Sequence, residues 1–232
     1  MGKLRILGSG TSTGVPEIGC TCPVCTSTDP RDNRLRASSL LHTDDAVILI
    51  DCGPDFREQM LRASSFEKID GVLVTHEHYD HVGGLDDLRP FGRFADKVYP
   101  GVPRIYLQEV EAGQVFHINR TEVLPLRVMH GRLPILGYRI GGRLGYITDM
   151  HMMPEESYEQ LKGLDVLVMN ALRPKPHPTL QSISEALEAA GRIGAKETYF
   201  IHMSHHAGLH ADIEKRLPPH VHFAYDGLEI DF

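Results

Sequence analysis

Three histidines and one aspartate fall within the six residues HEHYDH at positions 76–81, directly after the apolar run GVLV at 71–74. Imidazole and carboxylate groups at this density are typical of sites for divalent first-row metal ions. His76 and His78 are two residues apart, so an extended backbone directs both imidazoles to the same side. A polar loop with incidental histidines is the alternative, but it does not explain why this density follows a buried strand.

The rest of this segment indicates that more than one ion is held. Asp80 and His81 follow where the chain is expected to turn into a helix, and Gly83 and Gly84 are expected to ease that turn. Four imidazole and carboxylate groups would crowd a single ion. The segment therefore predicts a site for two metals, which needs further ligands from elsewhere in the chain.

Three more ligand-type side chains each end an apolar run. His130 closes LPLRVMH, Asp149 closes LGYITD and His202 closes TYFIH. A buried charge at a strand end needs a partner, and a metal ion would provide one. Each residue alone is a weak indication, because a histidine at a strand end is commonly just hydrogen-bonded. Together with the first segment, they predict one centre built from several strand ends.

The elements that would position these residues are mostly short strands. Apolar runs bounded by Gly, Pro or Asp are typical of strands. We expect strands at 3–10, 46–51, 71–76, 104–107, 122–130, 136–141, 143–149, 164–170, 197–202 and 221–230. The two glycines at 141–142, between two such runs, predict a hairpin with a two-residue loop.

Helical patterning covers three segments. Residues 182–194 carry one apolar face, a capping box at the start and a glycine at the end. The segments 54–64 and 154–163 each begin at a proline, which is favoured in the first turn of a helix. Clusters of strands with interspersed helices predict two packed sheets flanked by helices, in one α/β domain over residues 1–232.

The composition disfavours a nucleic-acid-binding protein and a membrane protein. The 24 Lys and Arg residues against 31 Asp and Glu residues give a net charge of −7, which disfavours broad contact with nucleic acid. No apolar run approaches the roughly 18 residues that span a bilayer, and the start MGKLRILGSG lacks a signal-peptide apolar region. We therefore expect a cytoplasmic protein with no membrane partner and no stable nucleic-acid complex. A homodimer would be ordinary.

The order HxHxDH, His, Asp, His along the chain resembles the metallo-β-lactamase superfamily of αββα hydrolases. The resemblance spans essentially the whole chain. It implies that one metal is bound by His76, His78 and His130, that the second is bound by Asp80, His81 and His202, and that Asp149 bridges them. It also implies that Asp51, which ends VILID, supports the ligands by accepting imidazole N–H groups.

A cluster of cysteines indicates a further metal. Cys20, Cys22 and Cys25 lie in GCTCPVC, and such clustering without a signal peptide favours a metal over disulfides. A reactive or redox thiol cluster is the alternative. A closed zinc site needs a fourth ligand. Cys52 is available but ends an apolar run, where a buried free cysteine is the ordinary interpretation, so His205 is the stronger candidate.

Within the superfamily, GCxCxxC combined with a late HxSH segment resembles the phosphoribosyl cyclic phosphate phosphodiesterases of the carbon–phosphorus lyase pathway. This resemblance implies a structural zinc held by Cys20, Cys22, Cys25 and His205. It also implies that His177, in RPKPHPTL, is a general acid or transition-state stabiliser outside the metal shell. His206 has no comparable context, and its part in any site stays open.

The implied function is a dinuclear phosphodiesterase. Two divalent ions, Mn²⁺ or Zn²⁺, with Asp80, Asp149 and a bridging hydroxide leave a local charge of about +1. That charge attracts a small phosphodiester, cyclic ribosyl or nucleotide, and the bridging hydroxide attacks it. The alternatives are a transfer-RNA 3′-end endonuclease of the same superfamily, a thioester hydrolase, and a catalytically silent metal- or nucleotide-binding protein. A basic, Gly- and Pro-rich arm for transfer RNA is missing, and the complete ligand set disfavours a silent protein.

Overall fold

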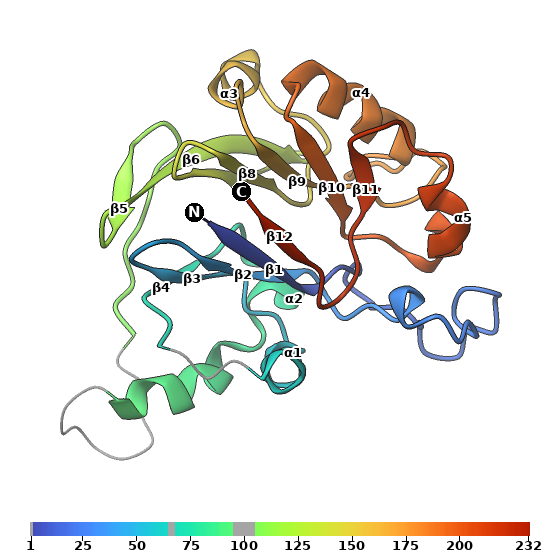
Figure 1. The fold of residues 1–232 in the computed structure, drawn as a ribbon, viewed down its shortest axis with the longest axis horizontal. Coiled ribbons are helices and arrows are strands. Elements are labelled where there is room, and N and C mark those ends of the chain that lie inside the picture. Colours follow the sequence, from blue (N-terminus) through green and yellow to red (C-terminus); the bar gives the residue numbers. More distant parts are fainter. Residues whose placement is uncertain (1, 65–67, 95–104) are drawn as a thin grey trace.

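The computed structural model describes residues 2–64, 68–94 and 105–232, which form two sheets packed face to face (Figure 1). The first sheet has the spatial order β12 (Glu229–Asp231), β1 (Lys3–Gly8), β2 (Ser38–His42), β3 (Val47–Ile50), β4 (Gly71–Leu73). The second has the order β11 (Val221–Phe223), β10 (Glu197–Ile201), β9 (Val166–Asn170), β8 (Leu144–Ile147), β7 (Leu133–Ile140), β6 (Thr121–His130), β5 (Phe116–Ile118). Parallel pairs are β3–β4, β8–β9, β9–β10 and β10–β11; the other neighbours are antiparallel.

Helices flank the two sheets (Figure 1). They are α1 (Phe56–Ala63), α2 (Tyr79–Val82), α3 (Glu155–Gln160), α4 (Ile183–Ile193) and α5 (His210–Glu214), with 3₁₀ turns at Pro30–Asp32, Leu85–Phe94 and His205–Ala207. The expected αββα fold class is confirmed. Among the described residues, no helix combines the length and apolar character needed to cross a bilayer.

The core has three layers, and alternate side chains of each strand contribute to different layers. In β3, Ile48 and Ile50 pack between the sheets, whereas Leu49 packs outward with Phe56 of α1. The third layer lies between the second sheet and helices α3 and α4. A one-residue slip would move every side chain of a strand to the wrong layer, so the registers are strongly fixed. The strand ends, where the predicted ligands lie, are fixed with them.

Two predicted strands were wrong in detail. Residues 105–107 form no strand, and position 104 lies outside the described residues. Tyr106 and Leu107 are 85% and 94% exposed, so this apolar run has no layer to pack against. The segment 221–230 forms two strands, β11 and β12, in different sheets. Gly227, with φ 90°, lies in the turn between them.

Other local predictions are confirmed with small corrections. Helix α4 begins at the expected capping box, in which the Ser182 side chain accepts from the Glu185 backbone N–H, and ends at Gly194 with φ 71°. The hairpin at Gly141 and Gly142 joins β7 to β8, but the loop has three residues rather than two, because Ile140 pairs with Leu144. Strands β2 and β5 were not predicted from the sequence.

The glycines after α2 have a different role from the one expected. Neither Gly83 nor Gly84 has a positive φ, so they do not supply an unusual turn. A Cβ on Gly84 would lie 2.0 Å from the Gly53 carbonyl oxygen, and a Cβ on Gly53 would lie 2.1 Å from the Asp80 carbonyl oxygen. These glycines let the backbone carrying Asp80 rest directly on the end of β3.

Replacing Gly53 with alanine is therefore expected to destabilise the protein. Overpacking of this kind typically costs about 1–3 kcal/mol, which corresponds to a fall in Tm of roughly 2–12 °C for a chain of this size. Gly191→Ala in α4 is the matched control, because a Cβ there meets no atom within 4 Å and should leave the Tm unchanged or higher. Thermal denaturation followed by circular dichroism measures both. Equal Tm values for Gly53→Ala and the unaltered protein would contradict the packing argument.

Candidate metal centre

The predicted ligands meet at one edge of the two sheets. The segment 76–81 follows β4, His130 ends β6, Asp149 follows β8 and His202 follows β10. Since β6 and β8 are both antiparallel to β7, and β8, β9 and β10 are mutually parallel, these carboxyl ends lie on the same side of the second sheet. Residues far apart in sequence are brought into one site by strand direction alone.

Three imidazoles form one part of the centre. Nε2 of His76 and Nδ1 of His78 lie 2.9 Å apart, as expected for residues on the same side of an extended segment. The centre of the His130 ring lies 5.2 Å from the centre of the His78 ring and 5.7 Å from that of the His76 ring. The structure thus groups the three histidines that the family resemblance assigns to one metal.

Two carboxylates and two imidazoles form the other part. His81 Nε2 lies 3.2 Å from an Asp80 oxygen and 3.3 Å from an Asp149 oxygen. His202 Nε2 lies 3.2 Å from the other Asp149 oxygen and 3.6 Å from Asp80. Potential ligand atoms of Asp80, His81 and His202 lie within 4.8 Å of one another, and so do those of His76, His81 and Asp149. Asp149 therefore adjoins both parts of the centre.

Two buried imidazole nitrogens without a hydrogen-bond partner indicate that the predicted ligands fit a cation. Within the described residues, Nε2 of His81 and Nε2 of His202 are buried and make no hydrogen bond of good geometry. A buried polar atom without a partner costs free energy, and each of these nitrogens faces two carboxylates. Mixed nitrogen and oxygen donors suit first-row divalent ions. The residues present therefore fit such ions.

The electrostatics of the centre favour positive charge. Burial alone would raise the pKa of the Asp80 carboxyl, but the adjacent His202 and His81 imidazoles outweigh it and lower that pKa. The Asp149 pKa is likewise lowered, because the neighbouring histidines outweigh its burial. Burial opposes a proton on His81, yet the Asp51 and Asp149 charges raise its pKa. The buried carboxylates thus form a pocket that is suited to a cation.

The imidazole of His76 behaves differently. Burial, followed by the charge of His81, lowers the His76 pKa to about 3. His76 is therefore neutral at ordinary pH and has a lone pair free for a metal, as imidazole ligation requires.

Asp51 lies where the resemblance placed it, behind the ligands. Its buried carboxylate accepts from the Thr75 backbone N–H at 2.8 Å and from the Thr75 hydroxyl at 2.9 Å. Nδ1 of His81 lies 2.7 Å from the same carboxylate. A hydrogen bond from Nδ1 fixes the tautomer and the ring orientation, which turns Nε2 toward Asp80 and Asp149.

Three site residues share an unusual backbone conformation that sequence reasoning missed. Asp51, Asp149 and His202 have φ values of 59°, 55° and 58°. This left-handed region is uncommon for residues other than glycine and costs free energy, on the order of 1–3 kcal/mol. Each residue directly follows or nearly follows a strand, so the conformation turns the chain sharply out of the strand at the centre.

Asn170, the last residue of β9, was also missed. Its buried Oδ1 accepts from the Met150 backbone N–H at 2.7 Å, and its Nδ2 donates to the Met150 carbonyl oxygen at 2.9 Å. The amide therefore clamps the backbone directly after Asp149. The sequence signal was a polar residue closing the apolar run LDVLVMN, which resembles the signal of the ligands themselves.

Loss of this clamp should loosen Asp149. We expect Asn170→Ala to weaken binding of divalent metal by roughly 10–100-fold, the usual effect of removing a group that orients a ligand. Competition with a chelating dye measures the affinity. Asn33→Ala is the control, since Asn33 is exposed and lies in the N-terminal loop. Unchanged affinity in Asn170→Ala would contradict the clamp.

His177 lies in the loop before α4 and is partly buried. Its Nδ1 accepts from the Thr179 backbone N–H at 3.4 Å, with the Thr179 hydroxyl at 3.3 Å. Because Nδ1 accepts, the neutral ring carries its hydrogen on Nε2. Burial, and then the charge of Arg173, lowers the His177 pKa. A Cβ on Gly131, the residue after His130, would lie 2.8 Å from Thr179 Cγ2, so the loop that carries His177 packs against the end of β6.

Two of the three N-terminal thiols, those of Cys20 and Cys25, lie close to His205, whereas Cys22 is not in that group. Potential ligand atoms of Cys20, Cys25 and His205 lie within 4.8 Å of one another. Cys22 Sγ accepts from the Cys25 backbone N–H at 3.4 Å, which lowers the Cys22 pKa, whereas burial raises the Cys25 pKa to about 11. His205 Nδ1 lies 3.0 Å from a Glu17 carboxylate oxygen.

The two residues left open by the sequence fall in different places. Nε2 of His206 lies 3.1 Å from Nε2 of His205, at the edge of the thiol cluster. Cys52 is fully buried among the side chains beneath α1, and burial raises its pKa to about 12. Cys52 therefore has the environment of an ordinary core cysteine.

The chain is similar in sequence to a known protein family and to a curated protein. Residues 47–203 match the family model of the beta-lactamase superfamily domain. A protein of Porphyromonas gingivalis named octanoyltransferase is 47% identical over 249 residues, which cover 97% of the chain and 50% of that protein. The chain thus spans about half the length of this curated relative.

Two solved structures superpose on the whole chain. The structure of a new diphosphatase from the PhnP family is 38% identical, with a TM-score of 0.94, and the match covers 100% of the chain and 98% of that structure. Zn²⁺-bound PqqB from Methylobacterium extorquens is 20% identical, with a TM-score of 0.75 over 99% and 100%, a likeness of fold alone. The family model, the sheet order and the strand-end ligand set agree, and the chain belongs to the beta-lactamase superfamily.

Proposed function

We propose that the chain is a dinuclear metal-dependent phosphodiesterase that hydrolyses a small phosphodiester of the cyclic ribosyl or nucleotide type. The observation that carries this proposal is the pair of buried carboxylates, Asp80 and Asp149, which face both His81 and His202 at 3.2–3.6 Å. Chemistry at phosphorus is supported by the 38% identity, over the full chain, with a structure named as a diphosphatase.

In this proposal the ligands divide between two ions, Mn²⁺ or Zn²⁺. The first would be held by His76, His78 and His130, the second by Asp80, His81 and His202, and Asp149 would contribute to both. When bound, the two ions would activate a water molecule and neutralise charge on the phosphate. A neutral His76 imidazole and ionised Asp80 and Asp149 carboxylates are the forms that the pKa shifts of these three groups favour.

The chain's own residues would supply positioning and a proton. Asp51 orients His81, and Asn170 holds the backbone after Asp149. Hydrolysis breaks one P–O ester bond, and the departing oxygen must gain a proton as the water oxygen joins phosphorus. As the imidazolium, which has a hydrogen on both ring nitrogens, His177 would give its Nε2 proton to that departing oxygen and become neutral.

A turnover assay of the metal-loaded protein tests the reaction class. The panel contains ribosyl cyclic phosphate, nucleoside cyclic phosphates, a chromogenic diester, inorganic diphosphate, a precursor transfer RNA and an octanoyl thioester. Fast opening of a small cyclic diester would support the proposal. No turnover of any diester, with two divalent ions bound per chain, would contradict it.

The thioester arm of this panel tests a second candidate function. A hydrolase acting on an acyl thioester is favoured by one observation, the 47% identity with a protein named octanoyltransferase. That match covers only half of the relative, so the activity in the relative's name can belong to its other half. Cleavage of the octanoyl thioester without cleavage of any phosphodiester would favour this candidate.

The same proposal includes a structural zinc bound by Cys20, Cys22, Cys25 and His205, supported by the approach of Cys20, Cys25 and His205. We expect Cys25→Ala to lose one zinc ion per chain and to lower the Tm, because a closed zinc site contributes folding free energy. Cys52→Ala, in the core beneath α1, should keep the full zinc content. Inductively coupled plasma mass spectrometry gives the count, and full zinc content in Cys25→Ala would contradict the site.

A further inference from the structure

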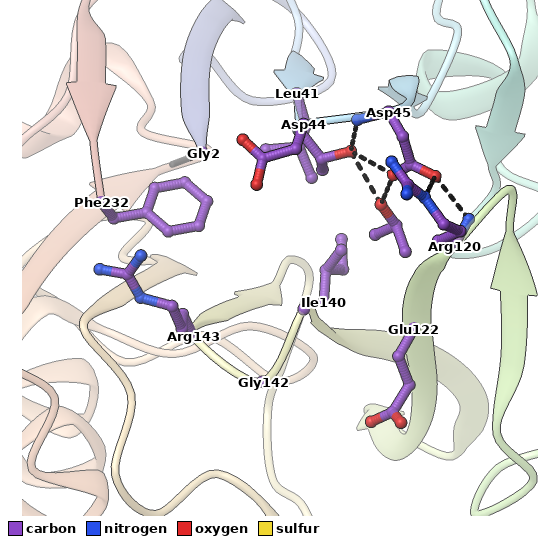
Figure 2. Close-up of a pocket in the computed structure, with 13 residues that line it drawn as sticks. Gly2, Leu41, Asp44, Asp45, Arg120, Glu122, Ile140, Gly142, Arg143 and Phe232 are labelled. Carbon is purple, nitrogen blue, oxygen red and sulfur yellow. Dashed lines mark hydrogen bonds and ion pairs between the residues drawn. The ribbon is translucent and has the colours of Figure 1, made fainter.

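A cleft lies at the end of the molecule opposite the metal centre. Its volume is about 600 Å³, and its lining comes from the turns after β2, β5 and β7 together with both chain ends (Figure 2). Strand β1 starts beside the cleft and leads to Gly10, which bridges Met203 beside the ligand His202. At about 3.3 Å per extended residue, the cleft and the centre are roughly 25 Å apart.

The lining is a mixture of charged groups around an aromatic ring. Figure 2 shows Arg143 beside the Phe232 ring, with the carboxylates of Asp44 and Glu122 elsewhere on the rim. The Arg143 guanidinium lies 5.8 Å from the centre of the Phe232 ring and pairs with Asp165 outside the lining.

The cationic groups of the lining are already engaged, whereas one anionic group is not. Arg120 pairs with Asp45 at 3.3 Å, and Arg143 pairs with Asp165. Within the described residues, the Glu122 side chain makes no ion pair, and it is exposed. An incoming basic side chain would find a carboxylate partner here and an aromatic surface for its aliphatic stem.

Both chain ends emerge at this cleft. The Gly2 backbone N–H donates to the Phe232 carbonyl oxygen at 2.8 Å, and the Phe232 N–H donates to the Gly2 carbonyl oxygen at 2.9 Å. The Porphyromonas gingivalis relative matches 97% of the chain with only 50% of its own length. Whichever end of the shared fold is extended in that relative, its remaining half must leave beside the equivalent cleft.

We propose that the cleft is the docking surface for a second folded domain, equivalent to the remaining half of the Porphyromonas gingivalis relative, which inserts a lysine or arginine side chain beside Glu122. Contacts between domains of this kind bury about 600–1,500 Å² and are comparatively polar, as this lining is. A domain docked here leaves the metal centre open to small substrates, roughly 25 Å away by the strand length.

The test measures association between the metal-loaded chain and the remaining half of the Porphyromonas gingivalis relative, produced as a separate protein whose folded state is first verified by circular dichroism and a cooperative thermal transition. Isothermal titration calorimetry at low and high salt gives the affinity. We expect the affinity to fall as salt is added, because exposed charge pairs are screened. We also expect Glu122→Lys to lower the affinity by about tenfold or more, through like-charge repulsion.

Two matched variants locate the surface. Glu188→Lys makes the same charge change on α4, and Met152→Lys places a lysine at an exposed position that pairs with Met129, next to His130. Both should bind as the unaltered chain does, and Glu122→Lys and Glu188→Lys should keep its Tm and its turnover of small substrates. No binding, equal binding by Glu122→Lys, or loss only in Met152→Lys would each overturn the proposal. The result is independent of which reaction the centre catalyses.

Discussion

Replacing Asp149 with asparagine is expected to reduce turnover by at least about 10²-fold, since removal of groups that merely orient ligands already costs 10–100-fold. Asp149 contacts both His81 and His202, so the substitution removes the negative charge shared by both parts of the centre. Asparagine is chosen because it keeps the size of aspartate and tolerates the left-handed φ of 55° at this position.

Three measurements separate this effect from misfolding. Metal content should fall, turnover should fall with it, and the Tm measured with chelator present should stay close to that of the unaltered chain. Asp231→Asn makes the same change at an exposed position in β12 and should alter none of the three. Full activity with full metal content in Asp149→Asn would rule out a shared ligand role for Asp149.

The second large effect is expected from His177→Ala. Removal of a proton donor typically costs about 10²–10⁴-fold in turnover, and His177 lies outside the ligand groups. We therefore expect kcat to fall while metal content and KM change little. His117→Ala, at an exposed position of β5, is the matched control.

The choice of substrate distinguishes a proton donor from a merely structural histidine. A nitrophenolate leaving group can depart without gaining a proton, because that anion is stable at neutral pH. The loss in His177→Ala should therefore be much smaller for the nitrophenyl diester than for an alkyl diester. Equal losses for the two substrates would remove the proton-donor role.

Much of the metal centre could be predicted from the sequence because its geometry follows from strand direction. Apolar runs that close on His130, Asp149 and His202 give the strand ends directly, and strands running the same way bring those ends together. The segment 76–81, which is rich in histidine and aspartate, marks the contribution of the first sheet, after β4. Local patterns were sufficient here because each predicted ligand lies at or shortly after the end of a strand.

Features that depend on contacts between distant segments could not be predicted. Asn170 was missed because its role is set by the Met150 backbone, in the segment that follows the neighbouring strand β8. Gly83 and Gly84 were assigned to a turn, but the reason for glycine at position 84 is the approach of Gly53 from another loop. The cleft near the chain ends is formed by three turns that no sequence motif connects.

The left-handed backbone at Asp51, Asp149 and His202 has a consequence for how this centre can change over evolutionary time. Amino acids at these positions must satisfy a torsion angle as well as a chemical role, and aspartate, asparagine and histidine tolerate that angle better than other side chains. Cysteine binds soft metals well but lacks this tolerance. A change to cysteine therefore carries a backbone cost at these three positions that it does not carry at predicted ligands without a positive φ, such as His76 and His130, so we expect a shift in metal preference to begin at the latter.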